Sequence, residues 1–101
     1  MPRSVYVMLI EVDLGDQAED AFTHAFCNAF SAGENSQDAV DRACAVLVEL
    51  GYKILEVDGI QLVTFAHLSR YDDETREAVK EVGANGTPLF GNFNAYDPSK
   101  E

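Results

Sequence analysis

Basic residues are scarce in this sequence: seven lysines and arginines stand against eighteen aspartates and glutamates, which gives a formal net charge of −11. Such a surface repels nucleic-acid phosphates and anionic lipid headgroups, so neither nucleic acid nor a membrane is expected as a partner. The charge would instead attract a basic protein, a basic peptide or a cation. The alternative is that it only keeps the protein in solution.

Long apolar runs and cysteines are also few. The strand-like run at residues 5–14 is far too short to cross a bilayer, and no signal-peptide pattern precedes it. The two cysteines, Cys27 and Cys44, both have apolar neighbours in the sequence. We therefore expect a cytoplasmic protein in which both thiols stay reduced and pack as small hydrophobic side chains.

Catalytic and metal-binding motifs are missing as well: there is no G-x-S-x-G, no nucleotide-binding fingerprint and no C-x-x-C. His24 and Cys27 form an H-x-x-C pair, but zinc needs about four ligands. The other soft donors are Cys44 and His67, and both lie in apolar surroundings. We expect no metal, no cofactor and no catalytic residue.

The sequence does contain enough apolar residues for one hydrophobic core, at 47% of 101 residues, and neither a repeat nor a linker divides it. We therefore expect a single domain over residues 1–101. Residues 5–14, VYVMLIEVDL, alternate as a strand, yet both of its faces are apolar as far as Ile10. Because helices of so short a chain can cover one face, we expect a second subunit to close the other, in a homodimer.

Residues 17–31 can be interpreted in two ways. Alanines and phenylalanines recur at i, i+3 and i+4, which supports an amphipathic helix. A strand would instead give the first strand an early antiparallel neighbour. It would also suit residues 30–43, FSAGENSQDAVDRA, whose pattern is typical of a strand that leads into a capped helix. We predict the strand and keep the helix as the alternative.

The clearest helix signal covers residues 37–50. Asn35 or Ser36 is expected to cap its amino end, and Gly51 is expected to end it. The predicted buried stripe consists of Val40, Ala43, Cys44, Leu47 and Leu50. This spacing is that of a helix packed on a sheet through one side.

The second half of the chain predicts a hairpin, a helix and a last strand. Asp58-Gly59 separates two β-branched runs, so residues 53–57 and 60–66 are predicted as a hairpin, with one strand bent at Gly59 as the alternative. A helix is predicted over residues 71–82, from the cap Asp72 to Gly83, and a strand over residues 89–96. Together these elements predict an α+β fold of ferredoxin-like style. It has a single mainly antiparallel sheet, the order β-β-α-β-β-α-β and both helices on one face.

Residues 26–58, FCNAFSAGENSQDAVDRACAVLVELGYKILEVD, resemble the strand–helix–strand core of small bacterial α+β proteins. They are similar to the same unit in HicB-like antitoxins, where a strand ends in a cap and a helix with an acidic residue and alanine follows. The aspartate-leucine-proline-glycine turn typical of that group is missing ahead of Ser36. The resemblance therefore supports the strand but carries over neither a toxin-binding nor a DNA-binding role.

Two sets of residues are candidates for a functional surface. The acidic set, expected to bind a partner, is Glu11, Asp13, Asp16, Glu19 and Asp20. The second set would line a ligand pocket and is Phe22, His24, Phe26 and Phe30. The first set predicts a non-enzymatic, homodimeric interaction protein, immunity- or antitoxin-like, that binds a basic partner. The second predicts a small-molecule-binding protein or an enzyme.

Overall fold

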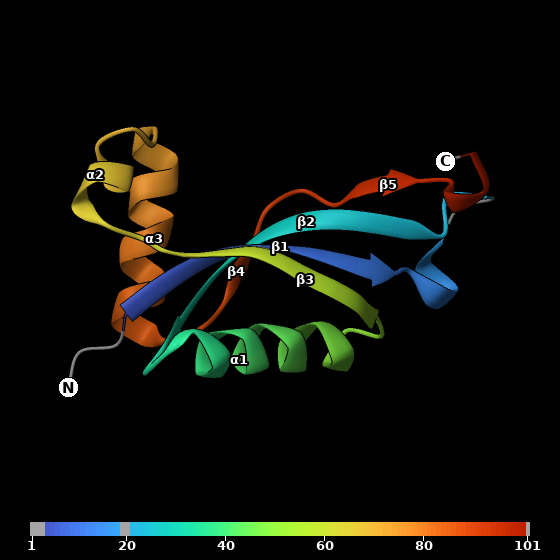
Figure 1. Cartoon of the computed structure of the whole chain (residues 1–101), viewed down its shortest axis with the longest axis horizontal. Helices are drawn as coiled ribbons and strands as arrows, with labels where there is room; N and C mark the ends of the chain where they lie inside the picture. The colour runs from blue at the N-terminus through green and yellow to red at the C-terminus, as the bar shows by residue number, and fades with distance from the viewer. Residues whose placement is uncertain (1–3, 19–20, 101) are drawn as a thin grey trace.

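The computed structural model describes residues 4–18 and 21–100, and the described chain is built on one antiparallel sheet of five strands (Figure 1). β1 (Ser4–Asp13) pairs on one side with β2 (His24–Gly33) and on the other with β3 (Lys53–Leu62). Two short strands, β4 (Leu89–Phe90) and β5 (Asn94–Tyr96), pair with the far side of β2. The predicted α+β class with an antiparallel sheet is confirmed.

β2 decides between the two interpretations of residues 17–31, because residues 24–33 form a strand as predicted. It pairs with β1 over its whole length, from Ser4 opposite Gly33 to Asp13 opposite His24. Ala25, Cys27 and Ala29 alternate along it and are buried. Cross-strand pairing with β1 therefore outweighs a local periodicity that also suited a helix.

α1 (Ser36–Glu49) connects β2 to β3 and packs across one face of the sheet. Its amino end is capped as expected, because the Asn35 side-chain oxygen accepts a hydrogen bond of 2.9 Å from the Asp38 N–H. The side chains that face the sheet are Ala39, Ala43 and Leu47, all fully buried. β1 lies between β2 and β3 and is antiparallel to both, so β2 and β3 run parallel to each other. α1 connects them by crossing over β1.

α1 lies unusually close to the end of β2. The Ser31 hydroxyl, which is buried, donates a hydrogen bond of 2.7 Å to the Ala39 carbonyl. A Cβ atom placed on Gly33 would lie only 2.6 Å from the Ala39 nitrogen. Only glycine therefore fits at position 33 without moving the helix backbone.

β3 is one continuous strand, so the predicted hairpin is wrong and the alternative, a strand bent at Gly59, holds. Val7 pairs with Gln61 and Leu9 with Asp58, so two β3 residues lie opposite one β1 residue in a bulge. Gly59 has a positive φ of 60° there. Gly59 thus has the left-handed backbone conformation that the turn signal indicated, but this conformation forms a bulge and not a hairpin turn.

The second long helix, α3 (Asp73–Asn85), follows the short α2 (Phe65–Leu68). Asp72 caps α3 as predicted, accepting a hydrogen bond of 2.8 Å from the Thr75 N–H. Hydrogen bonding by the Thr75 side chain, and then by this N–H, holds the pKa of the Asp72 carboxyl below its usual value. The helix does not end at Gly83 as expected. It continues for more than half a turn to Asn85, and Gly86 ends it with a left-handed φ of 75°.

The expected placement of both helices on one face is not confirmed. α1 covers the face that carries Met8 and Ile10. α3 contacts the opposite face, which carries Val5: a Cβ atom placed on Gly83 of α3 would lie 3.5 Å from the Val5 side chain. Figure 1 shows α1 along one side of the sheet and α2 and α3 at one end. The ferredoxin-like order is not confirmed either. β3 is one strand and the last predicted strand is split into β4 and β5.

The core lies between the sheet and α1. Met8, Ile10 and Val12 of β1 are buried there with the small residues of β2 and with Leu47. Val79 and Val82 of α3 are also buried, at the end of the sheet where α3 packs. Among residues 4–18 and 21–100, no helix is long and apolar enough to cross a membrane.

Candidate interaction surface

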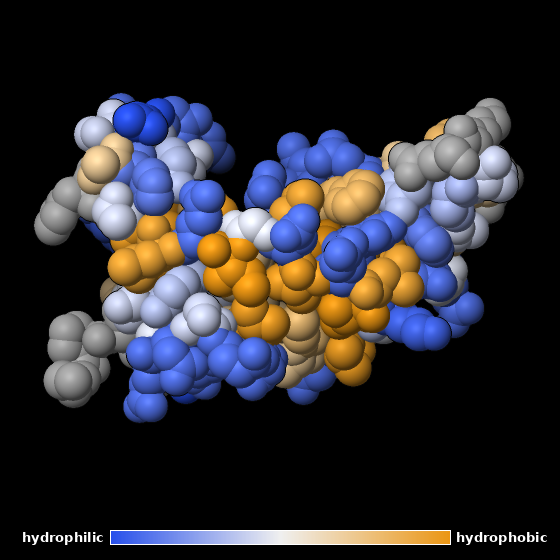
Figure 2. Space-filling model, viewed as in Figure 1, coloured by the Kyte–Doolittle hydropathy of each residue, from blue (hydrophilic) through white to orange (hydrophobic). Residues whose placement is uncertain are grey.

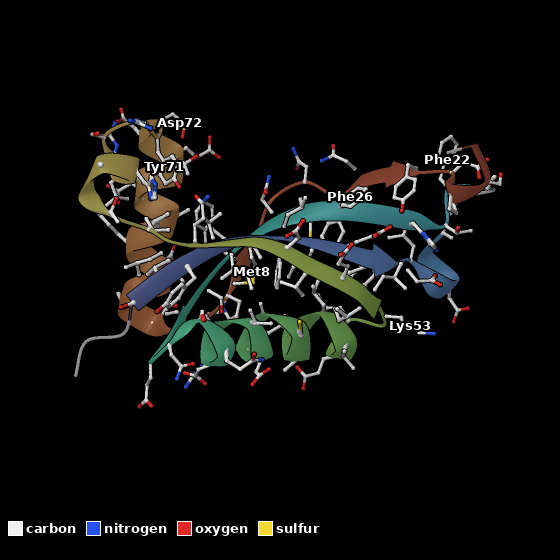
Figure 3. The ribbon with its side chains drawn as sticks, viewed as in Figure 1. Met8, Phe22, Phe26, Lys53, Tyr71 and Asp72 are labelled. Carbon is white, nitrogen blue, oxygen red and sulfur yellow. The ribbon has the colours of Figure 1, made fainter. Side chains whose placement is uncertain are left out.

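The second face of the sheet is covered by α3 at one end only. The uncovered part, called the open face below, consists of Leu9, Glu11, Asp13, His24, Phe26, Asn28, Lys53, Glu56 and Asp58. These residues share a face because Glu11 pairs with both Phe26 and Glu56, and paired residues in neighbouring strands point the same way. In Figure 3, Phe26 points away from α1 and Met8 points toward it.

Glu11 is held in place at the centre of this surface. The Tyr96 hydroxyl donates a hydrogen bond to the Glu11 carboxylate. His24 Nδ1 lies 3.7 Å from the same carboxylate oxygen and 3.4 Å from the Tyr96 hydroxyl. Only 17% of the Glu11 side chain and 25% of the His24 side chain are exposed. β5 creates this cluster, because its pairing with β2 sets Tyr96 opposite His24.

Aromatic rings surround the cluster. The Phe26 ring stacks on the Tyr96 ring with centroids 5.2 Å apart, and the His24 ring meets Tyr96 edge-on at 5.7 Å. Beside Phe26 lies a shallow depression of about 40 Å³. Its lining residues are Leu9, Glu11, Phe26, Glu56 and Asp58. The depression therefore combines apolar walls with three carboxylates, and can take the end of one cationic side chain.

The predicted acidic set is divided by the structure. Glu11 and Asp13 lie on the open face, and Asp16 lies beyond the end of β1 in a short 3₁₀ turn (Gly15–Gln17). Glu19 and Asp20 lie outside the described residues. The open face adds Glu56 and Asp58, which the sequence interpretation missed because it placed them in a hairpin, Glu56 in its first strand and Asp58 in its turn.

The predicted pocket set does not converge on one cavity. His24 and Phe26 lie together on the open face, whereas Phe30 lies nearer α3 and meets the Tyr71 ring edge-on at 6.0 Å. Phe22 precedes β2, and 48% of it is exposed. The sequence interpretation also missed Tyr96. Its place in the C-terminal strand gave no signal that it would reach Glu11.

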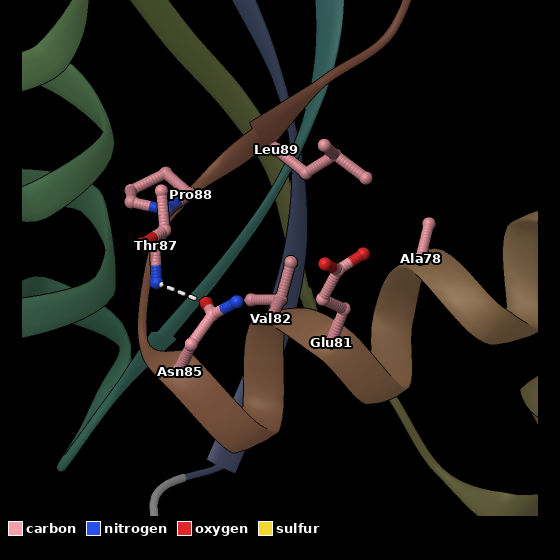
Figure 4. A pocket seen from close by; sticks show the side chains of 7 residues that line it. All are labelled: Ala78, Glu81, Val82, Asn85, Thr87, Pro88 and Leu89. Carbon is pink, nitrogen blue, oxygen red and sulfur yellow. Dashed lines mark hydrogen bonds between the residues drawn. The ribbon is translucent and has the colours of Figure 1, made fainter.

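Larger hollows lie at the α3 end of the molecule. Figure 4 shows one of about 140 Å³ between α3 and β4, where the Thr87 N–H donates a hydrogen bond of 2.9 Å to the Asn85 side chain. Another, of about 460 Å³, lies between the start of β1, the end of β3 and α3, and its walls include Val5, Leu62 and Val79. The predicted pocket residues line neither of these two hollows.

Both thiols belong to the packed interior side of their elements. Burial raises the pKa of Cys27 to about 11. Burial also raises the pKa of Cys44, and the nearby negative charge of Asp41 raises it further. Cys27 lies on the α1 side of β2 and His24 on the opposite face, so this imidazole cannot act on that thiol.

We therefore expect both cysteines to react slowly while the protein is folded. At pH 8 about one thousandth of Cys27 would be thiolate, because the pH is about three units below its pKa. The measurement is the absorbance released from a disulfide reagent, with the protein in guanidinium as the control in which both thiols react. Rapid reaction of Cys27 in the folded protein would contradict its burial.

Searches with protein-family models, among curated proteins and among solved structures found no match. The chemistry of the open face must therefore be inferred from its own residues. Within the described ranges, no three or more His, Cys, Asp or Glu side chains lie close enough to hold a metal ion. What the face offers is one oriented carboxylate, Glu11, and the exposed carboxylates of Glu56 and Asp58 beside aromatic rings, which suits recognition of positive charge.

Proposed function

We propose that the protein is a non-enzymatic interaction protein that binds a basic partner through its open face. Such a role is of the kind that immunity proteins and antitoxins perform, in which an acidic protein covers the basic surface of another. The observation that supports it is the convergence of Glu11, Glu56 and Asp58 from two paired strands at one aromatic-walled depression. The net charge of −11 would draw a basic partner toward this surface.

The fixed position of Glu11 strengthens the proposal. A carboxylate that is already oriented by Tyr96 and His24 loses little side-chain freedom when it meets a cation. An arginine or lysine side chain could lay its methylene stem along Leu9 and the Phe26 ring and present its charge to the carboxylates. The depression thus matches a protruding basic side chain better than a whole small molecule, since ligand cavities are usually about 300–1,000 Å³.

The homodimer expected from the sequence finds less support at this face. α3 already covers one end, near Val5 and Phe30. Face-to-face packing of the remaining part would set the carboxylates of one copy against those of another. Like charges brought together out of water are strongly destabilising. We therefore propose a basic partner, and not a second copy, for the open face.

A labelled peptide of ten lysines tests the proposal by fluorescence anisotropy. The double variant Glu56→Gln, Asp58→Asn removes two charges from the open face while keeping the size of both side chains. We expect it to bind the peptide about three- to thirtyfold more weakly at 50 mM salt, from two exposed ion pairs of about 0.3–1 kcal/mol each. Binding to the unmodified protein should also weaken as salt rises.

The matched control is the double variant Glu74→Gln, Glu77→Gln. It also removes two negative charges, but from α3 and away from the open face. It should change the affinity by less than about twofold, since charges beyond a Debye length are screened. Equal weakening by both double variants would show that only net charge matters, and would contradict the proposal.

A further inference from the structure

β3 is an outer strand with a free edge. In the described sheet it pairs only with β1, whereas the opposite side of β2 is covered by the short β4 and β5. Leu55, Ile60 and Leu62 of β3 are 40%, 41% and 46% exposed. Figure 2 shows hydrophobic side chains gathered in the middle of the molecule, where β3 and α1 lie in Figure 1. A long outer strand with apolar side chains is a template for pairing with another chain.

The two sides of this edge differ in chemistry. Glu56 and Asp58 point to the open face, because they pair with Glu11 and Leu9. Ile54 and Val57 point to the α1 side, because they pair with Val12 and Ile10 of the buried core. A strand added beside β3 would therefore meet carboxylates on one face and apolar side chains on the other.

We propose that an extended segment of the basic partner adds to the free edge of β3 as a further strand. Its side chains alternate, with lysine or arginine on the open-face side and apolar residues on the α1 side. The segment's backbone pairs with β3, and its basic side chains reach Glu56, Asp58 and the depression at Glu11. This inference rests on the proposed function, and specifies the shape and side-chain pattern of the partner.

A second copy of this chain fits the edge less well. In antiparallel self-pairing with the two-fold axis at Glu56, Val57 or Asp58, a carboxylate of one copy lies opposite a carboxylate of the other. Like charges directly opposite each other in a sheet are destabilising. A basic strand instead gains an opposite charge at each of these positions.

The two bulges of β3 limit the length of the pairing. One lies at Gly59 and Ile60, and the other at Leu55, where Ile54 and Glu56 pair with adjacent β1 residues. Between them, residues 56–58 keep a regular register with β1. Bulges of this kind protect an outer strand from long, unspecific pairing. We expect a short added segment whose affinity depends on charge as well as on backbone hydrogen bonds.

Peptides of one composition test the inference with the unmodified protein. The first alternates lysine and valine over eight residues, and the second contains the same residues as four lysines followed by four valines. Anisotropy should show at least tenfold tighter binding of the alternating peptide.

Two further peptides have the alternating sequence and carry N-methyl groups, one on all lysine amides and the other on all valine amides. Because only every second amide of an added strand points to β3, one methylated peptide should bind at least tenfold more weakly and the other less than threefold.

The protein side is tested by Glu56→Lys, with Glu77→Lys on α3 as the control of equal charge change. Only Glu56→Lys should weaken binding of the alternating peptide, by at least tenfold. Hydrogen exchange should show new protection of β3 amides when that peptide is added. Protection of β3 that rises with protein concentration, without peptide, would assign the edge to a second copy and overturn the inference.

The possible failures can be told apart. If both unmethylated peptides bind equally and methylation has no effect, strand addition is wrong while recognition of basic segments still stands. If neither these peptides nor ten lysines bind, the proposed function fails as well. The methylated peptides use the unmodified protein, so this outcome does not depend on how well any variant folds.

Discussion

Leu47→Ala is expected to lower the free energy of unfolding by about 2–5 kcal/mol. Leu47 is fully buried in the middle of the core, between α1 and the sheet. Shortening it removes three carbon atoms and leaves a cavity, because the packed neighbours relax only in part. The loss would be a large share of the stability of a domain of this size, typically about 5–15 kcal/mol. Chemical denaturation followed by circular dichroism measures it.

Leu50→Ala is the matched control, since it makes the same change three residues further along. Leu50 was expected on the buried stripe of the helix, but 56% of it is exposed in the structure. Its loss should therefore be about 0.5 kcal/mol or less. Equal losses at the two positions would mean that α1 packs through a different side than the one described.

Gly33→Ala is expected to destabilise the protein by about 1–3 kcal/mol, although alanine usually suits a strand better than glycine. Its Cβ would lie 2.6 Å from the Ala39 nitrogen and 3.0 Å from the Ala39 Cα. Both are backbone atoms of α1, so no side-chain rotation relieves the overlap. The first turn of the helix would have to move away from β2, which would also strain the hydrogen bond from Ser31 to Ala39.

Gly83→Ala should have the opposite effect. Gly83 lies inside α3, and a Cβ there would meet Val5 Cγ2 at 3.5 Å, an ordinary contact distance. Replacing a helical glycine by alanine should stabilise the protein by about 0.5–1 kcal/mol. Denaturation curves of the two variants should therefore shift in opposite directions. A neutral Gly33→Ala would show that α1 does not approach β2 as closely as described.

The parts of the fold that local signals control could be predicted from the sequence. α1 combines a capping Asn35 with a regular apolar stripe, and both are visible within a single helix length. Asp72 likewise caps α3. β2 was harder, since its alanines and phenylalanines fit both periods. The first strand's need for an antiparallel neighbour and the strand-to-capped-helix pattern of residues 30–43 favoured the strand.

The errors arose where long-range pairing overrides a local signal. Asp58-Gly59 has the residues of a two-residue turn, yet β1 offers a partner along the whole of β3 and the same residues form a bulge. Asp58 was therefore assigned to a turn, and Glu56 to a hairpin strand, instead of to the open face. Tyr96 was missed for a similar reason, because its contact with Glu11 depends on β5 pairing with β2.

The hydrogen bond from Tyr96 to Glu11 joins positions 85 residues apart. A ribosome adds about 5–20 residues per second, so Glu11 is made on the order of ten seconds before Tyr96. During that interval β1, β2 and α1 can already pair and pack, but the carboxylate at the centre of the open face has no tyrosine to orient it. The open face is thus completed only after Tyr96 has been made, long after β1 and β2 have been synthesised.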